Sequence, residues 1–299
     1  MTRPGYKLIP RAQLVCAATA TLVFCAASLP THAAPEPGAA RLRPATIEAF
    51  ERYVQLTEAR NNEELRLGAP FLYVDALPEA ERTAAFAALR RGGVKLERRE
   101  TREDERAIVC PGGMIHHWEG VVFVPGATLG ETLALLQDYD HHAKYYTPDV
   151  ERSKIERHDG DDFRVFLRFR RHKVITVVLD TEHEVRYTRD SATRAHSRSS
   201  GVRIAEVENA GKPNEREKSP GEDGGFLWRM ETWWRMEERD GGVYVQSEVV
   251  SLTRDIPTGL GWLIGPFVSS IPRESLTFTL EATRKAVDAQ RARREPALR

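Results

Sequence analysis

The sequence predicts an α+β fold in which a curved antiparallel sheet wraps around one long C-terminal helix. Polar and apolar residues alternate over long stretches from Met114 onward, and this period of two is typical of strands that bury one face. The chain then closes with a helix that is apolar over a wide arc, which suits a helix lying across a concave sheet. Such an arrangement usually encloses a cavity, so binding of a hydrophobic molecule is the leading hypothesis.

The main domain is predicted over residues 112–290 and begins with a strand at 114–124. A capping box at Thr128 and Glu131 opens a helix that runs to about residue 138. A second short helix, at 139–146, stops before Pro148. The segment 211–225 is rich in Gly, Pro and charged residues, which indicates an exposed excursion. Further strands are expected at 150–158, 162–171, 173–189, 192–208, 226–239 and 242–254.

The closing helix separates its side chains clearly. At 100° per residue, Leu276, Leu280 and Val287 fall on the wide apolar arc, whereas Glu281 and Lys285 fall on the complementary one. Pro272 and Glu274 suit the first turn of such a helix. Residues 291–299 are predicted to form a disordered tail.

Residues 1–33 are predicted to be a secretory signal peptide. Arg3, Lys7 and Arg11 form a basic region, residues 14–29 are apolar, and Ala33 offers a small-residue cleavage site. Export to the periplasm or beyond is therefore expected. The whole chain balances 44 basic against 44 acidic residues, so loss of these three cations leaves a net charge of −3, which does not favour nucleic acid as a partner.

Residues 34–111 are predicted to be a leader and a small helical extension. A helix is expected at 46–67 and a second between Pro78 and Gly92. The apolar content of the extension is too low for a core of its own, so we expect it to pack on the main domain. Cys110 is the single cysteine left after removal of the signal peptide, which excludes an internal disulfide and favours simple packing.

The order of the elements and the segment from Asp255 through the glycines and prolines to Leu276 resemble the START-like (SRPBCC) superfamily, above all its uncharacterised exported bacterial members. The likeness covers about residues 114–290 and contains no catalytic signature. The resemblance implies the helix-grip fold. It also implies a cavity for a lipid or polycyclic ligand between the sheet and the C-terminal helix, with no cofactor.

Alternation within the strands selects the residues expected to face this cavity. Residues 163–169 place their apolar side chains on one face and Arg164, Arg168 and Arg170 on the other. Residues 228–236 place two Trp and two Met on one face, which suits an adaptable apolar pocket. A solid core without a cavity is the alternative. The predicted cavity residues are Phe163, Val165, Leu167, Phe169, Trp228, Met230, Trp234, Leu276 and Leu280.

Residues 256–270 form the most distinctive segment, which we call the gate segment. It is predicted to be an apolar loop loosened by glycines, and it either tucks beneath the helix or gates the cavity and touches a membrane transiently. The residues assigned to the gate are Gly259, Gly261, Trp262, Leu263 and Phe267.

Two other groups of polar residues could bind a metal or take part in catalysis, but we favour a structural role for both. Adjacent histidines on a strand, such as His116 and His117, point to opposite faces, so at most one of each pair could bind a metal, and no metal site is predicted. Glu231, Glu248, Arg198 and Arg229 lie on neighbouring strands. They fit cross-strand ion pairs on a solvated face better than acid–base catalysis.

Three functions remain open from the sequence. The first is a carrier or sensor that binds or transfers a lipid or other hydrophobic small molecule. The second is a cyclase-like or hydrolytic enzyme that uses the same cavity, which requires a buried ionisable group that points inward with a shifted pKa. The third is an envelope interaction protein with a filled core. Export favours the carrier, and the oligomeric state is not indicated.

Replacing Trp262 and Leu263 with Asp should slow ligand transfer from lipid vesicles, because the gate would lose its apolar contact with the membrane. The measurement is a vesicle-transfer assay, with circular dichroism to confirm that the fold is retained. An unchanged transfer rate would remove the gate from the mechanism.

Overall fold

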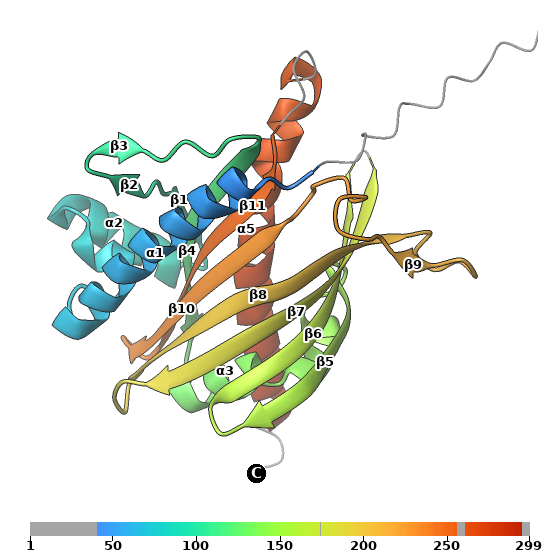
Figure 1. The fold of residues 1–299 in the computed structure, drawn as a ribbon. Coiled ribbons are helices and arrows are strands. Elements are labelled where there is room, and N and C mark those ends of the chain that lie inside the picture. The colour runs from blue at the N-terminus through green and yellow to red at the C-terminus, as the bar shows by residue number, and fades with distance from the viewer. Residues whose placement is uncertain (1–40, 174, 256–260, 295–299) are drawn as a thin grey trace, which may run out of the picture. The chain divides into compact units, whose positions relative to one another are not determined.

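A nine-stranded antiparallel sheet dominates the computed structural model (Figure 1). The structure describes residues 41–173, 175–255 and 261–294. At residues 261–269 and 294 it describes the backbone alone. The eight strands of the main path run in the order β1-β4-β11-β10-β8-β7-β6-β5, and β9 pairs with β8. The strands are β1 (Val94–Arg98), β4 (Gly113–Pro125), β5 (Val150–Asp159), β6 (Asp162–His172), β7 (Thr176–Arg189), β8 (Arg194–Glu208), β9 (Arg216–Glu217), β10 (Arg229–Arg239) and β11 (Gly242–Arg254). β2 (Arg102–Glu103) and β3 (Arg106–Ala107) form a separate hairpin.

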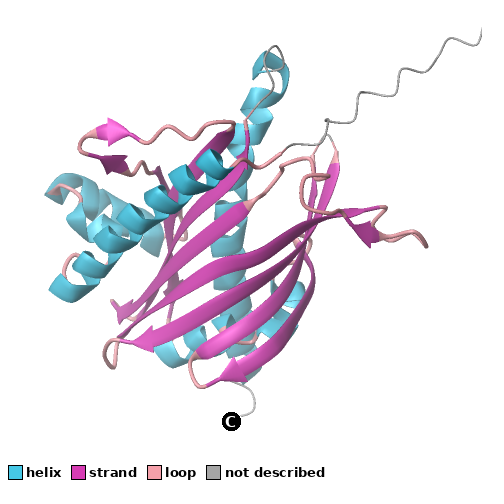
Figure 2. Cartoon of the chain, in the orientation of Figure 1, coloured by secondary structure: helices cyan, strands magenta, loops and turns pink. Residues whose placement is uncertain are grey.

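Helices cover both faces of this sheet (Figure 2). We call the face toward α5 (Gly261–Arg294) the inner face and the face toward α1 (Pro44–Leu67) the outer face. The remaining helical segments are η1 (Tyr73–Ala76), α2 (Glu79–Arg90), α3 (Leu129–Leu136), η2 (Tyr139–His141) and α4 (His142–Tyr145). The sheet therefore has no broad solvated face along β4, β10 and β11, and its alternating side chains enter two different interiors.

The inner face forms the largest apolar core. Val122 on β4, Val245 on β11, Met236 on β10 and Val165 on β6 are fully buried in it, together with Leu280 of α5. Gly120 allows the helix to approach β4 closely, since a Cβ atom there would lie 2.7 Å from Leu280 Cδ1 and 2.5 Å from Leu96 Cδ2. A glycine in the middle of a strand thus sets the distance between the sheet and α5.

The outer face carries two smaller apolar clusters. Phe50 of α1 packs with Trp233 and Leu252, and Leu89 of α2 packs with residues that include Tyr244. Through these clusters, α1 and α2 pack on the outer face of the sheet.

The predicted α+β helix-grip fold is confirmed, and the main strands begin and end close to their predicted bounds. The capping box is confirmed as well. Thr128 Oγ1 accepts from the Glu131 N–H, and Glu131 Oε2 accepts from the Thr128 N–H at 3.0 Å. Beyond these strands, the structure adds β1 at the sheet edge.

The prediction of a loop over the gate segment is wrong for residues 261–270, which belong to α5. The apolar residues Leu263, Phe267 and Ile271 recur every fourth position, as in a helix, and this pattern outweighs the glycines and prolines that suggested a loop. Gly259 and the rest of 256–260 lie outside the described residues. Among the helices that the structure describes, none combines the length and the apolar character needed to cross a membrane.

Gly120→Val should lower the free energy of unfolding by about 1–3 kcal/mol, because its branched side chain would overlap the buried Leu280. Gly130→Ala is the control, since a Cβ at Gly130 meets nothing within 4 Å. Urea denaturation measures both variants. Equal stabilities would contradict the close approach of α5 to β4.

Candidate functional site

The inner face gathers most of the side chains that the sequence assigned to a cavity. Phe163, Val165, Leu276 and Leu280 belong to the buried core between the sheet and α5. Leu167 and Phe169 continue the same face of β6 and are half-buried. These six residues therefore lie on the predicted side of the sheet.

Burial on the inner face decreases along the central strands. Val122, Val245 and Met236 lie toward the β10–β11 turn and are fully buried. Farther along the same strands and on the same face, the side chains keep part of their surface accessible. These half-buried residues are Trp118, Val249, Trp234 and Met230.

Trp228 lies on the other side of the sheet from the predicted one. It precedes β10 and packs with Phe50 and Trp233 on the outer face, where its Nε1–H donates to Asp223 Oδ1 at 2.8 Å. The prediction extended the alternation of β10 to Trp228, the residue directly before the strand begins. Periodicity determines the face only while the backbone remains in the ladder.

Two histidines bring titratable groups to the inner face. His183 pairs in register with Val165 and hydrogen-bonds Thr181 Oγ1 at 2.9 Å, and His116 hydrogen-bonds Thr253 Oγ1 at 3.0 Å. Burial lowers the pKa of each imidazole to about 4, so both are neutral near pH 7. Neither ring contacts a carboxylate within the described residues.

Two buried hydroxyl groups on the inner face lack a partner. Ser197 and Ser247 are the register partners of Trp234 on its two sides, and their Oγ atoms make no hydrogen bond with any residue that the structure describes. A buried hydroxyl without a partner costs about 1–3 kcal/mol. These two groups are available to a bound molecule or to water.

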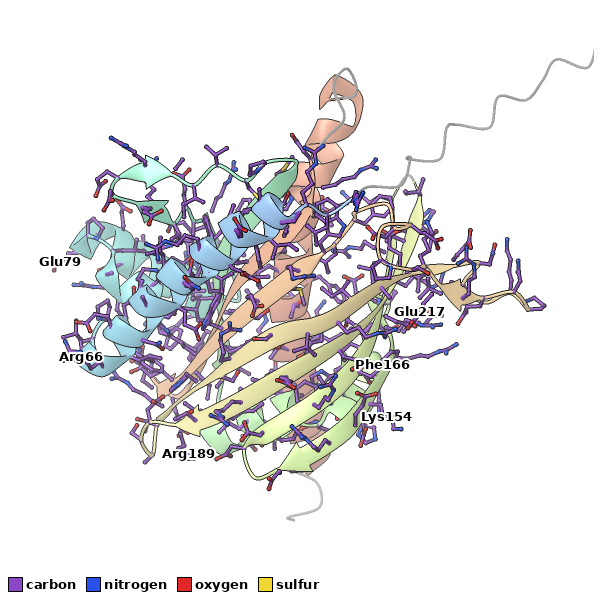
Figure 3. The ribbon with its side chains drawn as sticks, viewed as in Figure 1. Arg66, Glu79, Lys154, Phe166, Arg189 and Glu217 are labelled. Carbon is purple, nitrogen blue, oxygen red and sulfur yellow. The ribbon has the colours of Figure 1, made fainter. Side chains whose placement is uncertain are left out.

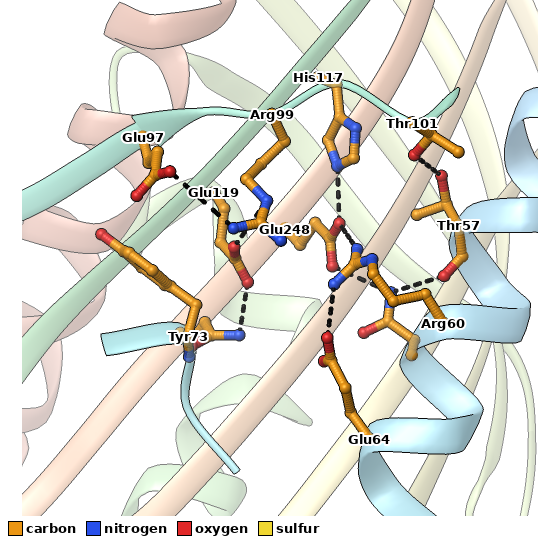
Figure 4. Close-up of polar contacts among 12 residues, drawn as sticks. Thr57, Arg60, Glu64, Tyr73, Glu97, Arg99, Thr101, His117, Glu119 and Glu248 are labelled. Atoms are coloured by element: carbon orange, nitrogen blue, oxygen red, sulfur yellow. Dashed lines mark hydrogen bonds and ion pairs between the residues drawn. The ribbon is translucent and has the colours of Figure 1, made fainter. Parts of the chain in front are cut away.

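The outer face contains a buried ionic network centred on Glu248, which is 1 % exposed (Figure 4). Its carboxylate accepts hydrogen bonds from Arg60, from Asn61 Nδ2 at 2.9 Å and from His117 Nε2 at 2.6 Å. Burial alone would raise the pKa of Glu248, but His117 and Arg60 outweigh it and bring the pKa to about 2. Burial lowers the pKa of His117, so Glu248 is the ionised member of this pair.

Further donors link His117 to α1 and to the loop after β1. The Tyr53 hydroxyl donates to His117 Nδ1 at 2.9 Å and accepts from the Thr101 N–H at 2.7 Å. The sequence analysis assigned Glu248 to a solvated face, and this is wrong because α1 covers it. Arg198 and Glu231 do form the predicted cross-strand ion pair.

Glu119 lies directly opposite Glu248 in the β4–β11 ladder. Burial and the nearby charge of Glu248 raise the pKa of Glu119 to about 8, because two adjacent buried carboxylates do not both ionise readily. Gln246 Nε2 donates to Glu119 Oε1 at 2.7 Å, and the Gln246 oxygen accepts from the Tyr73 N–H at 2.7 Å. This chain of contacts joins η1 to the sheet.

This network could not be predicted from the sequence, because its members lie far apart in the chain. Arg235 donates to Glu64 Oε2 at 2.6 Å and to the Phe71 carbonyl at 2.9 Å, across separations of 171 and 164 residues. One signal was present, since Glu119 on β4 and Glu248 on β11 interrupt strand faces that also carry apolar residues such as Val121 and Val250. Since α1 covers Glu248, the network holds this helix on the outer face of the sheet. The inner face, in contrast, offers accessible apolar surface.

The remaining sequence assignments concern the gate and metals. Gly261, Trp262, Leu263 and Phe267 lie on the first turns of α5, and their side chains fall outside the described residues. The described side chains include no group of three or more His, Cys, Asp or Glu arranged to hold a metal ion. Cys110 is half-buried, and burial raises the pKa of its thiol.

Comparisons with known proteins give matches only to solved structures, since no family model and no curated protein matches the chain. A STAR-related lipid transfer protein from Xanthomonas axonopodis is 16 % identical, with 64 % of this chain and 98 % of that chain covered and a TM-score of 0.40. The Zhui aromatase/cyclase from Streptomyces is 13 % identical, over 58 % and 94 %, with a TM-score of 0.37. Human STARD10 is 10 % identical, over 72 % and 84 %, with a TM-score of 0.40.

Glu119→Gln should remove a loss of stability that the wild type shows as the pH rises from about 5 to about 8. The folded protein keeps Glu119 protonated up to a pKa of about 8, whereas the unfolded chain ionises it near 4.5. The folded state therefore binds more protons in this range, so its free energy of unfolding falls by at most about 1.4 kcal/mol per pH unit.

Urea unfolding across this pH range gives the difference between wild type and variant. Glu79→Gln, on the exposed first turn of α2 (Figure 3), is the control for a lost surface charge and should change stability by less than about 0.5 kcal/mol. Parallel pH profiles for wild type and Glu119→Gln would show that Glu119 is ionised in the folded protein.

Proposed function

We propose that this protein binds, and carries between surfaces, a lipid or other hydrophobic small molecule on the inner face between the sheet and α5. The observation that supports this most directly is the set of apolar side chains that point toward α5 and yet keep accessible surface. Trp118, Met230, Trp234 and Val249 all do so, although they lie in the middle of the sheet. Apolar surface in a concave setting is what a hydrophobic ligand requires.

The polar groups of the inner face suit recognition better than catalysis. His116 and His183 are neutral, and each hydrogen-bonds a threonine hydroxyl. A general base that takes a proton from a substrate is commonly oriented by a carboxylate, and neither imidazole contacts one among the described side chains. The unpartnered hydroxyls of Ser197 and Ser247 would instead accept or donate a hydrogen bond to a polar group on the ligand.

A cyclase-like or hydrolytic enzyme remains the second candidate, and His116 and His183 are the observation that favours it. Both are buried and lie on the inner face with a shifted pKa, which is the feature that the enzyme hypothesis predicted from the sequence. His183→Gln separates the two functions. A carrier would retain its ligand with this change, whereas an enzyme would lose turnover.

Export and a transient contact with a membrane belong to the same proposal. A carrier outside the cytoplasm would collect its ligand from a lipid surface, and the apolar first turns of α5 include Trp262, Leu263 and Phe267. An envelope interaction protein with a filled inner face is the alternative that the next experiment addresses.

Native mass spectrometry of protein purified from its own host, followed by lipid extraction, tests the proposal directly. We expect a reproducible mass increment from one bound lipid-like molecule. Protein without any co-purifying molecule, which also takes up no hydrophobic probe, would favour the filled-core alternative.

Val249→Asp should weaken binding of a neutral fluorescent probe such as N-phenylnaphthylamine by roughly tenfold or more, because it adds a carboxylate between Trp118 and Thr232. The matched control is Val202→Asp, at a valine that is 46 % exposed. Val249→Phe keeps the site apolar and tests the effect of side-chain size alone. Circular dichroism confirms that each variant retains the fold. Equal affinities for all four proteins would place the ligand elsewhere.

A further inference from the structure

A surface cleft of about 290 Å³ lies between α4 and α5. The floor of the cleft is shallow and apolar. It is formed by Phe278 and, farther along the same side of α5, by the small residues Ala282, Ala286 and Ala289. Lys144, Tyr145 and Thr147 form the opposite wall. The cleft is large enough for a polar headgroup and the first part of a chain, but it is smaller than most complete ligand sites.

The rim of the cleft is cationic. Lys144, Lys285 and Arg293 line it and are exposed, against the single carboxylate of Glu281. None of the three cations forms an ion pair with a side chain in the described ranges. Most of the arginines on the sheet do form one, as Arg164 does with Glu182 at 2.6 Å. The unpaired charges leave a positive potential over an apolar floor.

The wall opposite α5 is held in a fixed position. The Tyr145 hydroxyl donates to Asp138 Oδ2 at 2.5 Å and accepts from Gln290 Nε2 at 2.9 Å. The bond from Gln290 ties α4 to α5 across the cleft, and the bond to Asp138 fixes the orientation of the Tyr145 side chain. The cleft is therefore preformed, which lowers the entropic cost of binding there.

The floor of the cleft is continuous with the inner face. Phe278 packs in the same cluster as Leu167 and Phe169, which continue the apolar face of β6, and Ala282 is buried in that cluster with Tyr146. Phe278 therefore separates the cleft from the apolar face of β6, and a hydrocarbon chain that displaces this side chain would reach that face. Its polar end would then stay at the cationic rim.

We propose that the cleft between α4 and α5 binds the anionic headgroup of a single amphiphile whose hydrocarbon chain lies on the inner face. This inference rests on the proposed function and narrows its ligand class to anionic amphiphiles such as a fatty-acid carboxylate. Lys285 and Arg293 contact the headgroup from α5, and Lys144 contacts it from α4. The apolar floor selects against a free anion that has no chain.

Displacement of neutral N-phenylnaphthylamine by dodecanoate and by dodecanol, both kept monomeric, tests the inference. Wild-type protein should bind dodecanoate more tightly than the uncharged alcohol of the same length. The double variant Lys285→Glu/Arg293→Glu should bind dodecanoate roughly tenfold more weakly and leave the affinity for dodecanol unchanged. If charge reversal disturbs α5, the neutral double variant Lys285→Gln/Arg293→Gln replaces it in the test. This variant should lose less affinity for dodecanoate.

Lys154→Glu is the matched control. Lys154 is exposed on β5 and points away from the inner face, since it pairs in register with Phe166 (Figure 3), and it forms no ion pair with the described residues. This variant should bind both probes as the wild type does.

The outcomes separate the inference from the proposed function. If wild-type protein binds neither dodecanoate nor dodecanol, the proposed function fails. If it binds both and the charge-reversed variant loses neither, or loses both equally, the headgroup site is overturned while the proposed function stands. Displacement of dodecanoate by inorganic phosphate alone would also overturn the inference, because the cleft would then be a site for a free anion.

Discussion

The outer half of this structure depends on the hydrogen bonds that the buried carboxylate of Glu248 accepts. It accepts hydrogen bonds from two α1 residues, Arg60 and Asn61, and from His117 of β4, so that one charge joins a helix to two strands. A buried charge is tolerated only when its partners are complete, and removal of one partner costs about 3–5 kcal/mol. The helix is therefore part of the same structural unit as the sheet.

The neighbouring carboxylate of Glu119 shows how the network limits its own charge. Because Glu119 and Glu248 face each other across the β4–β11 ladder, the outer face accommodates one anion there and keeps the second group protonated. Arg99 Nε lies 3.5 Å from Glu119 Oε2, but burial and the charge of Glu248 outweigh its effect on the pKa of Glu119. The inner face of the same two strands carries Val122 and Val245, which are apolar and require only close packing.

Much of the fold could be predicted from the sequence because its signals are local. Alternation fixes the inner face of β6 from Phe163 to Phe169, and the capping box fixes the start of α3. The failures arise where local rules end. Trp228 leaves the strand, so its face cannot be obtained from alternation. The contacts of Glu248 join residues 187 and 188 positions apart, and no single-sequence pattern records which helix covers a strand.

The alternation of β4 and β11 also constrains how this protein can change length. Each residue of these strands that faces α5 lies between neighbours that face the outer side, so Gly120 stands beside Glu119 and Ser247 stands beside Glu248. An insertion or deletion of one residue within either strand would turn the carboxylates toward the apolar core and the valines toward the arginines. We therefore expect length changes to be tolerated in the turns that connect the strands rather than within β4 or β11.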